Sequence, residues 1–448
     1  MIDPGHQKDL VDMIWERMAH LGYKQLHLTQ KINEIALKQG SENTYDNATV
    51  HNILKKNRGM SLAFLMIVTE ALGFVEGEFF PEYINQYLIV EHPSKTQVSK
   101  QKLNKFINLC IDKGLYEYCR LVVDKVKIID DPPIAILKGI AEKLEKIGQL
   151  DSAIYTYSII TSLVDFKLGE NAQIHIKKFI LQMELGMSKA YESAVELGVY
   201  ATYMDDEILK QRAYGLLIST YYLLDDWEKV YLYCDEQLKL VSIKNSGQLL
   251  ETLVYKIYAA RKKRDYKTAL ELIDQYQKAL GVKQSKWTMI LRLIIHVEMG
   301  DQGALNQLLQ LIKNYPPREN STDRVEYIPF LCLPIILSAF VKQSLLERVP
   351  GFMEEFNTEI TLLLEQDNLL DIKHIYAFLI ARADYNFLIG NTSQGLDDVI
   401  QAINCTLILK SQTLFALAVC KFSTYTTCAL PHQKSKFVEL CTTASKTF

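Results

Sequence analysis

The chain has 448 residues, of which 48% are hydrophobic and 23% are charged, and its formal net charge is −3. This length exceeds one ordinary hydrophobic core, so it predicts either several domains or an array of repeats. The near-neutral charge excludes a protein that coats nucleic acid over its whole surface, and the hydrophobic fraction excludes a disordered chain.

Residues 1–80 predict a bundle of short helices. Apolar residues recur at helical spacing over residues 7–20 and again over 28–36. Asp46 is a suitable N-cap for a third helix, and Ser61 for a fourth helix that Gly73 ends. Two short helices joined by a turn, with a helix before and after them, can place one polar helix in the major groove of DNA.

Local charge favours this end of the chain for DNA. Residues 24–58 hold six Lys or Arg against three acidic residues, a local charge of +3. Clustered cations of this kind contact phosphates and position a domain without reading sequence. The alternative is an ordinary small bundle whose lysines are only solvated.

After a predicted linker over residues 81–100, residues 101–448 predict stacked helical pairs. Because proline breaks helix interiors, the absence of proline between Pro133 and Pro316 indicates one helix after another. Short turns recur every 34 to 39 residues and then after 90, an interval that would hold two repeats of about 45. The predicted turns lie at Gly114, Gly148, Gly186, Asp225, Arg264, Gly300 and Gly390.

Prolines mark the predicted irregular places of this array. Pro316 and Pro317, followed by the segment 328–336, predict a joint or hinge, and Pro132 with Pro133 predicts a second interruption. The last pair, over residues 414–447, is rich in small and apolar residues and predicts a capping pair or a dimer seam.

No catalytic signature is present in the sequence. Phosphate-loop, dinucleotide, zinc-protease, nucleophile-elbow and C-x-x-C motifs are all missing, so we expect no enzyme activity, no metal and no cofactor. The eight cysteines predict small buried residues in a reducing compartment. The first residues do not form a signal peptide, and the longest apolar run, 328–341, is too short to span a membrane. We therefore expect a cytoplasmic protein with no membrane partner.

Spaced motifs in the first 75 residues carry a family resemblance. The order L-T-Q-x-I-x-x-I-A over 28–36, followed by T-V-x-x-I-L-K-K-x-R-G-x-S-L over 49–62, resembles the phage-repressor-like (XRE) helix-turn-helix family. The period of the remaining chain, with alanine where two helices approach closely, resembles degenerate tetratricopeptide repeats. Together they resemble the RRNPP family of bacterial peptide-pheromone receptors, which includes Bacillus quorum-sensing regulators and phage arbitrium receptors.

This resemblance implies an all-α protein with a helix-turn-helix domain over 1–80 and a right-handed tetratricopeptide-like α-solenoid over 101–448. It implies a transcription regulator, usually a homodimer, that binds a double-stranded DNA operator and a short signalling peptide. The base-reading side chains implied by the family pattern are Asn47, Ala48, His51 and Asn52. The expected phosphate contacts are Lys31, Lys55, Lys56 and Arg58. Thirteen residues separate Ala36 from Val50, about four more than is usual in the family, so the turn is enlarged.

The first helix of each repeat would line the concave wall, where an extended peptide binds. Projecting those helices onto the wall predicts a peptide site made of Gln173, Arg212, Tyr222, Glu251, Tyr258, Arg261, Trp287, Asp384 and Phe387. The basic cluster 261–264 is instead expected to be solvated at a helix end, where cations oppose the helix dipole.

Two other functions stay open from the sequence. One is a repeat scaffold that sequesters a protein partner and uses its N-terminal bundle for protein contacts. The other is a repressor-like regulator whose array serves only for dimerisation.

Overall fold

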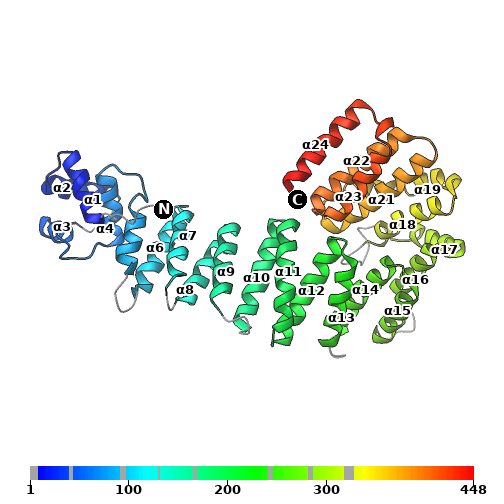
Figure 1. The fold of residues 1–448 in the computed structure, drawn as a ribbon, viewed down its shortest axis with the longest axis horizontal. Helices are drawn as coiled ribbons and strands as arrows, with labels where there is room; N and C mark the ends of the chain where they lie inside the picture. The colour runs from blue at the N-terminus through cyan, green and yellow to red at the C-terminus, as the bar shows by residue number, and fades with distance from the viewer. Residues whose placement is uncertain are drawn as a thin grey trace. The chain divides into compact units, whose positions relative to one another are not determined.

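The computed structural model describes residues 9–39, 44–90, 97–129, 132–164, 169–240, 246–280, 286–316 and 327–447 (Figure 1). Over these residues the protein is all-α, apart from one ribbon of two short strands. The chain forms two compact units, Met1–Asp165 and Phe166–Phe448. The all-α repeat architecture expected from the sequence is confirmed.

Unit 1 begins with a bundle of four helices. Ser61 and Asp46 cap helices as predicted: the Ser61 hydroxyl accepts from the Phe64 amide at 3.2 Å, and the Asp46 carboxylate accepts from the Thr49 amide at 2.6 Å. The helices are α1 (Leu10–His20), α2 (Gln25–Lys38), α3 (Asn47–Leu54) and α4 (Leu62–Ala71). Leucine, isoleucine and valine side chains on one face of each helix form the core of the bundle.

The predicted linker is folded wherever the structure describes it. It holds α5 (Phe80–Tyr83), a π-turn η1 (Ile84–Leu88) and strands β1 (Ile89–Val90) and β2 (Gln97–Val98), which pair antiparallel. Phe80 packs edge-on against Phe106 and Tyr118 at ring-centroid distances of 4.9 and 5.0 Å. Aromatic burial therefore joins α5 to the helices that follow, and unit 1 includes them.

Two helical hairpins complete unit 1. They are α6 (Lys100–Asp112) with α7 (Tyr116–Val126), and α8 (Ile134–Lys146) with α9 (Leu150–Leu163). The interruption predicted at Pro132 and Pro133 is present, since Pro133 is the N-cap residue of α8.

Unit 2 continues with helical hairpins. The first four pairs are α10 (Gly169–Leu185) with α11 (Met187–Tyr203), α12 (Glu207–Leu223) with α13 (Trp227–Leu240), α14 (Ser246–Lys262) with α15 (Tyr266–Leu280), and α16 (Lys286–Glu298) with α17 (Gln302–Lys313). The remaining elements are α18 (Ile328–Lys342), η3 (Leu346–Arg348), α19 (Val349–Glu355), α20 (Asn357–Leu364), α21 (Leu369–Leu388), α22 (Thr392–Leu409), α23 (Gln412–Thr424), η4 (Thr426–Cys428) and α24 (Pro431–Thr447).

The seven predicted turns are all confirmed by backbone geometry. Each named turn residue has a positive φ, from 61° at Arg264 to 128° at Gly186. Such a residue ends a helix by turning the chain into the left-handed region, which lets the next amide reach back to a free carbonyl. At the first turn, for example, the Leu115 amide donates to the Cys110 carbonyl at 2.8 Å.

The predicted proline joint is wrong for residues 328–336. They lie inside the continuous helix α18, where Pro329 occupies the first turn and Pro334 is interior. Eleven of the fifteen residues of α18 are buried, so packing offsets the lost backbone donor. Pro317 and residues 318–326 lie outside the described residues. The irregularity falls later, where Pro350 lies in the first turn of α19 and the second helix of that pair is divided into α19 and α20.

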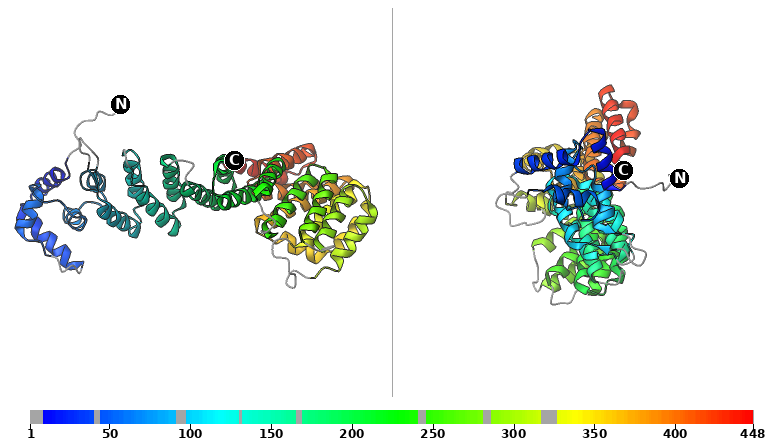
Figure 2. Two further views of the ribbon diagram at one scale, coloured as in Figure 1. Left: turned by 90° about the horizontal axis from the view of Figure 1, so that it is seen from below. Right: turned by 90° about the vertical axis from the view of Figure 1, so that its left-hand side faces the viewer.

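Unit 2 curves back on itself (Figure 2). Lys373 on α21 forms an ion pair with Asp225 at 2.9 Å and donates to the Tyr222 carbonyl at the end of α12. The Ser411 hydroxyl, before α23, donates to the Leu224 carbonyl at 3.3 Å. These contacts join segments about 150 residues or more apart in the chain. We call the contacts of Lys373 and Ser411 with residues 222–225 the latch.

Candidate functional sites

The first candidate surface is the polar face of α3 in unit 1. Asn47, Ala48, His51 and Asn52 are all exposed, as base-reading side chains must be. Gln25, at the start of α2, fixes two of them: its amide nitrogen donates to Asn47 Oδ1 at 3.0 Å, and its Oε1 lies 3.0 Å from His51 Nδ1. Asn52 has no side-chain hydrogen bond to a described residue and is therefore the freest of the four.

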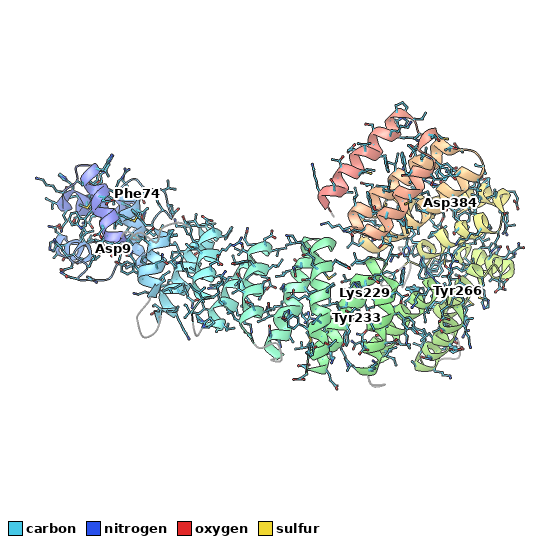
Figure 3. All side chains as sticks on the ribbon, in the orientation of Figure 1. Asp9, Phe74, Lys229, Tyr233, Tyr266 and Asp384 are labelled. Carbon is cyan, nitrogen blue, oxygen red and sulfur yellow. The ribbon has the colours of Figure 1, made fainter. Side chains whose placement is uncertain are left out.

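The four predicted phosphate contacts of unit 1 differ in their surroundings. Lys55 and Arg58 are exposed, with no ion pair to a described residue. Lys56 faces two carboxylates, at 3.2 Å from Asp9 Oδ2 and 3.5 Å from Asp12 Oδ1 (Asp9 is labelled in Figure 3). The ammonium group of Lys31 lies 5.1 Å from the centre of the Tyr23 ring. Two of these cations are therefore immediately open to an anion, and two are engaged.

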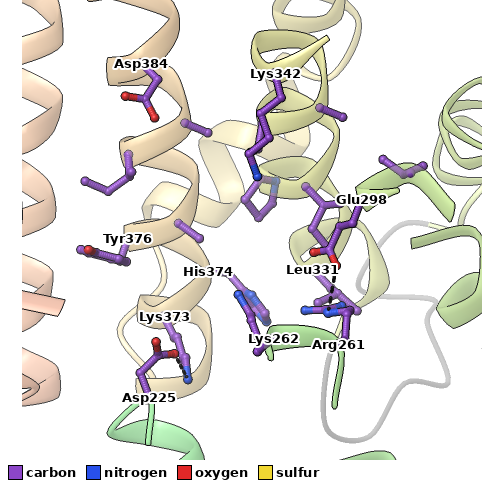
Figure 4. Close-up of a pocket in the computed structure, with 18 of the residues that line it drawn as sticks. Asp225, Arg261, Lys262, Glu298, Leu331, Lys342, Lys373, His374, Tyr376 and Asp384 are labelled. Carbon is purple, nitrogen blue, oxygen red and sulfur yellow. Dashed lines mark ion pairs between the residues drawn. The ribbon is translucent and has the colours of Figure 1, made fainter. Parts of the chain in front are cut away.

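The second candidate site is a cavity of about 620 Å³ in unit 2 (Figure 4). It is lined by α12, α14, α16, α18, α21 and α23, with the Asp225 turn and its latch at one end. Ligand cavities in proteins commonly span roughly 300–1,000 Å³. This volume suits a small molecule or a few residues of a peptide.

Four of the nine predicted peptide-site residues line this cavity: Tyr222, Tyr258, Arg261 and Asp384. The exposed residues Gln173, Arg212 and Glu251 do not line it. Trp287 and Phe387 are packing residues instead. Trp287 packs against the hydrophobic core, and Phe387 stacks on Tyr425 with ring centroids 3.8 Å apart.

The basic cluster 261–264 is not simply solvated, contrary to the sequence-based expectation. Arg261 is only 5% exposed and pairs with Glu298 at 3.7 Å inside the cavity. Lys262 also lines the cavity, with its ammonium group 5.8 Å from the centre of the Trp227 ring. The end of α14 reaches the cavity because the helical array curves around the cavity. The sequence of α14 alone does not encode this curvature.

Two ion pairs of the cavity wall, Asp225 with Lys373 and Glu298 with Arg261, are marked by the dashed lines in Figure 4. The aromatic rings of Tyr222 and Trp227 lie 4.3 and 4.4 Å from the Lys373 ammonium group. Burial alone would raise the pKa of Asp225, but the nearby cations, Lys373 foremost, hold it below the ordinary value. Asp225 is thus a carboxylate at neutral pH, and the latch is an ion pair.

Sequence reasoning missed several cavity residues: Lys262, Gln343, Lys342, Lys373, His374 and Lys421. Most lie within a turn or two of the ends of the first helices of their pairs. The concave face along a single helix does not include these positions, because the ends of α14 and α18 and the start of α21 come together only around the cavity.

A second cavity, of about 650 Å³, shares Asp225, Trp227 and Lys262 with the first. It is also lined by Tyr191 of α11, by Lys410 after the end of α22 and by Gln412 at the start of α23. The latch therefore borders both cavities.

Other chemistry is sparse over the described residues. No three His, Cys, Asp or Glu side chains there gather closely enough to hold a metal ion. None of the described helices combines the length and apolarity that crossing a membrane requires. Five cysteines are buried as predicted, but Cys420 and Cys428 are exposed, because they lie on the outer side of α23 and in the turn after it.

No protein-family model matches the chain, and no curated protein matches it in sequence. Among solved structures, it is similar to a signal transduction ATPase with numerous domains (STAND) that has a tetratricopeptide repeat sensor, from Pyrococcus horikoshii. The match has 11% identity and a TM-score of 0.32, and it covers 95% of this chain and 67% of that one.

Proposed function

We propose that this protein is a cytoplasmic, peptide-responsive transcription regulator that binds operator DNA as a homodimer. The observation that carries the proposal is the cavity of about 620 Å³ within the array, which has the size for a few peptide residues. The exposed face of α3, with Asn52 free and Asn47 held in place, supports DNA binding by unit 1. The resemblance to the RRNPP family implies the same pairing of functions.

The latch supplies a route from peptide to DNA. Tyr222 and Asp225, on one side of the latch, and residues of α21, on the other, line the same cavity. A peptide that contacts both sides favours the latched curvature of unit 2 over an open one. In a homodimer, a change in curvature resets the spacing of the two DNA-binding bundles, and a coupling of about 1–3 kcal/mol is typical of such linkage.

Genomic fragments retained by the purified full chain test both parts of the proposal. They would be sequenced with and without peptides extracted from spent culture medium, and binding would be repeated over a range of salt. We expect one enriched operator sequence, a steep salt dependence and a change in enrichment when peptide is present. Absence of sequence enrichment in both conditions contradicts DNA binding, and enrichment that peptides never change favours a repressor whose array only dimerises.

One observation favours the alternative of a scaffold that sequesters a protein partner. Helix α11 exposes an apolar stripe at every fourth residue, formed by Tyr191, Val195, Val199 and Tyr203, each between 44% and 57% exposed. Stripes of this kind are typical of protein interfaces. A scaffold predicts partner binding that is insensitive to salt and no retained DNA fragments.

A further inference from the structure

We infer that the cavity of unit 2 binds a carboxylate of its ligand between Lys262 and Lys342, beside the side-chain amide of Gln343. The inference rests on the proposed peptide-binding function and deepens it by naming the group that the cavity recognises. A peptide supplies a carboxylate either at its C-terminus or on an aspartate or glutamate side chain.

The charge balance of the cavity wall leaves two cations uncompensated. Its three carboxylates are each engaged, Asp225 by Lys373, Glu298 by Arg261 and Asp384 by Lys421. Lys262 and Lys342 also line the cavity, and neither has an ion pair with any residue in the described part of the chain. The wall therefore has a net charge of +2 that faces the ligand space.

These two lysines act on each other. Enclosure by protein lowers the pKa of Lys262, and the adjacent charges of Arg261 and Lys342 lower it further, against the partial opposition of Asp225 and Glu298. Both lysine side chains nevertheless remain open to the water of the cavity. An anion placed between them relieves this repulsion, whereas a cation or a neutral group does not.

Gln343 adds an unused hydrogen-bonding group at the same place. It follows Lys342 at the end of α18 and lines the cavity, and both polar atoms of its side chain are buried without a hydrogen-bond partner among the described residues. A buried amide without a partner is costly, so such groups usually face a ligand or water. The Gln343 amide can donate to a carboxylate oxygen.

Part of the remaining wall is apolar, which favours a carboxylate on an organic ligand over a small inorganic anion. Leu331, Pro334 and Ile335 of α18 lie on one side, and Ala377 and Ile380 of α21 lie on another. An apolar side chain next to the carboxylate would bury surface against them. A short peptide with an apolar residue close to its acid group fits this combination.

The test uses two pools of random hexapeptides, one with free C-terminal carboxylates and one with C-terminal amides. The full chain is incubated with each pool, separated from unbound peptide by size exclusion, and the bound peptides are identified by mass spectrometry. The variants are Lys262→Gln and Lys342→Gln, with Lys434→Gln, an exposed lysine of α24 outside the cavity, as the matched control.

We expect the wild-type chain to enrich peptides that carry a carboxylate, and each cavity variant to lose about tenfold of that enrichment while the control loses none. Enrichment from the free-acid pool alone assigns the C-terminus, and enrichment of Asp or Glu in the amide pool assigns a side chain. Because Lys342 lacks an ion-pair partner among the described residues, Lys342→Gln should melt no lower than the wild type, so its loss of enrichment reports on binding and not on folding. Equal enrichment of neutral peptides overturns the carboxylate site and leaves peptide binding intact, whereas no enrichment from either pool overturns both.

Discussion

Replacing Lys373 with methionine should open the latch of unit 2. Methionine keeps an apolar stem against Tyr222 and Trp227 but removes the ammonium group that holds Asp225. The side chains of Lys373 and Asp225 are 11% and 20% exposed, so Asp225 would be left as a largely buried carboxylate without its main partner.

The magnitude follows from this burial. Removing one partner of a fully buried ion pair typically costs about 3–5 kcal/mol, and the residual exposure here reduces the expected loss to about 2–4 kcal/mol. The double variant Lys373→Met with Asp225→Asn removes both charges and should recover much of that loss. Asparagine is suited to this position because Asp225 has a φ of 63°, which asparagine tolerates well.

Urea unfolding followed by tryptophan emission measures the effect. A Trp15→Phe background leaves Trp227 and Trp287, both in unit 2, as reporters. Lys436→Met is the control, because its ion pair with Glu439 on α24 is exposed and should contribute little. A Lys373→Met midpoint no lower than that of the control, or a double variant as unstable as the single one, would refute the assigned role of the latch.

The ion pair between Lys373 and Asp225 also makes the stability of unit 2 depend on pH. The pKa of Asp225 is lowered in the folded state, so its contribution is fully present above the ordinary aspartate pKa and is lost as pH falls through the lowered value. The difference in stability between the wild type and Lys373→Met should therefore shrink in acid. A difference that grows as pH falls would contradict this sign.

Three further substitutions have definite expected outcomes. Asn52→Ala should weaken operator binding by about 1–3 kcal/mol in a gel-shift titration without changing helical content, and unchanged affinity would remove α3 as the reading helix. Ser61→Ala removes the hydroxyl that accepts from the Phe64 amide and should destabilise unit 1 by about 1 kcal/mol in thermal unfolding, with unit 2 unaffected. Ser344 is exposed and has a φ of 56°, which glycine adopts more readily than serine, so Ser344→Gly should stabilise unit 2 by about 0.5–1 kcal/mol. Gly114 has a φ of 70°, so Gly114→Ala should destabilise unit 1. A lower unfolding midpoint of unit 2 in Ser344→Gly would contradict this reasoning.

Local chemistry made much of the fold predictable. Asp46 and Ser61 each cap the helix that follows them, as predicted. The cap is local, because the side-chain oxygen accepts a hydrogen bond from the amide three residues later. The repeat turns were equally local, since Gly114 or Gly300 ends a helix through its own backbone freedom. The prediction failed at residues 328–336, where burial of a whole helix overrides the effect of Pro334.

The cavity required information that lies beyond any one helix. Tyr258 and Arg261 were found from the sequence because they lie on the predicted wall of α14. Lys342, Gln343 and Lys373 were not, because their shared position depends on the small rotations between successive pairs, which add up around the array. Trp287 and Phe387 were predicted to line the peptide site but are packing residues. Whether such a side chain faces a groove or a neighbouring helix depends on which helix packs against it.

The sequence by itself thus determined the all-α class and the position of every named turn, because caps, turn residues and apolar periodicity act over a few neighbouring residues. Only the tertiary structure decided that the turn at Asp225 meets α21 across about 150 residues of chain and that a cavity with excess positive charge forms there. Contacts of that range depend on the accumulated curvature of many helical pairs, and no local pattern encodes that sum.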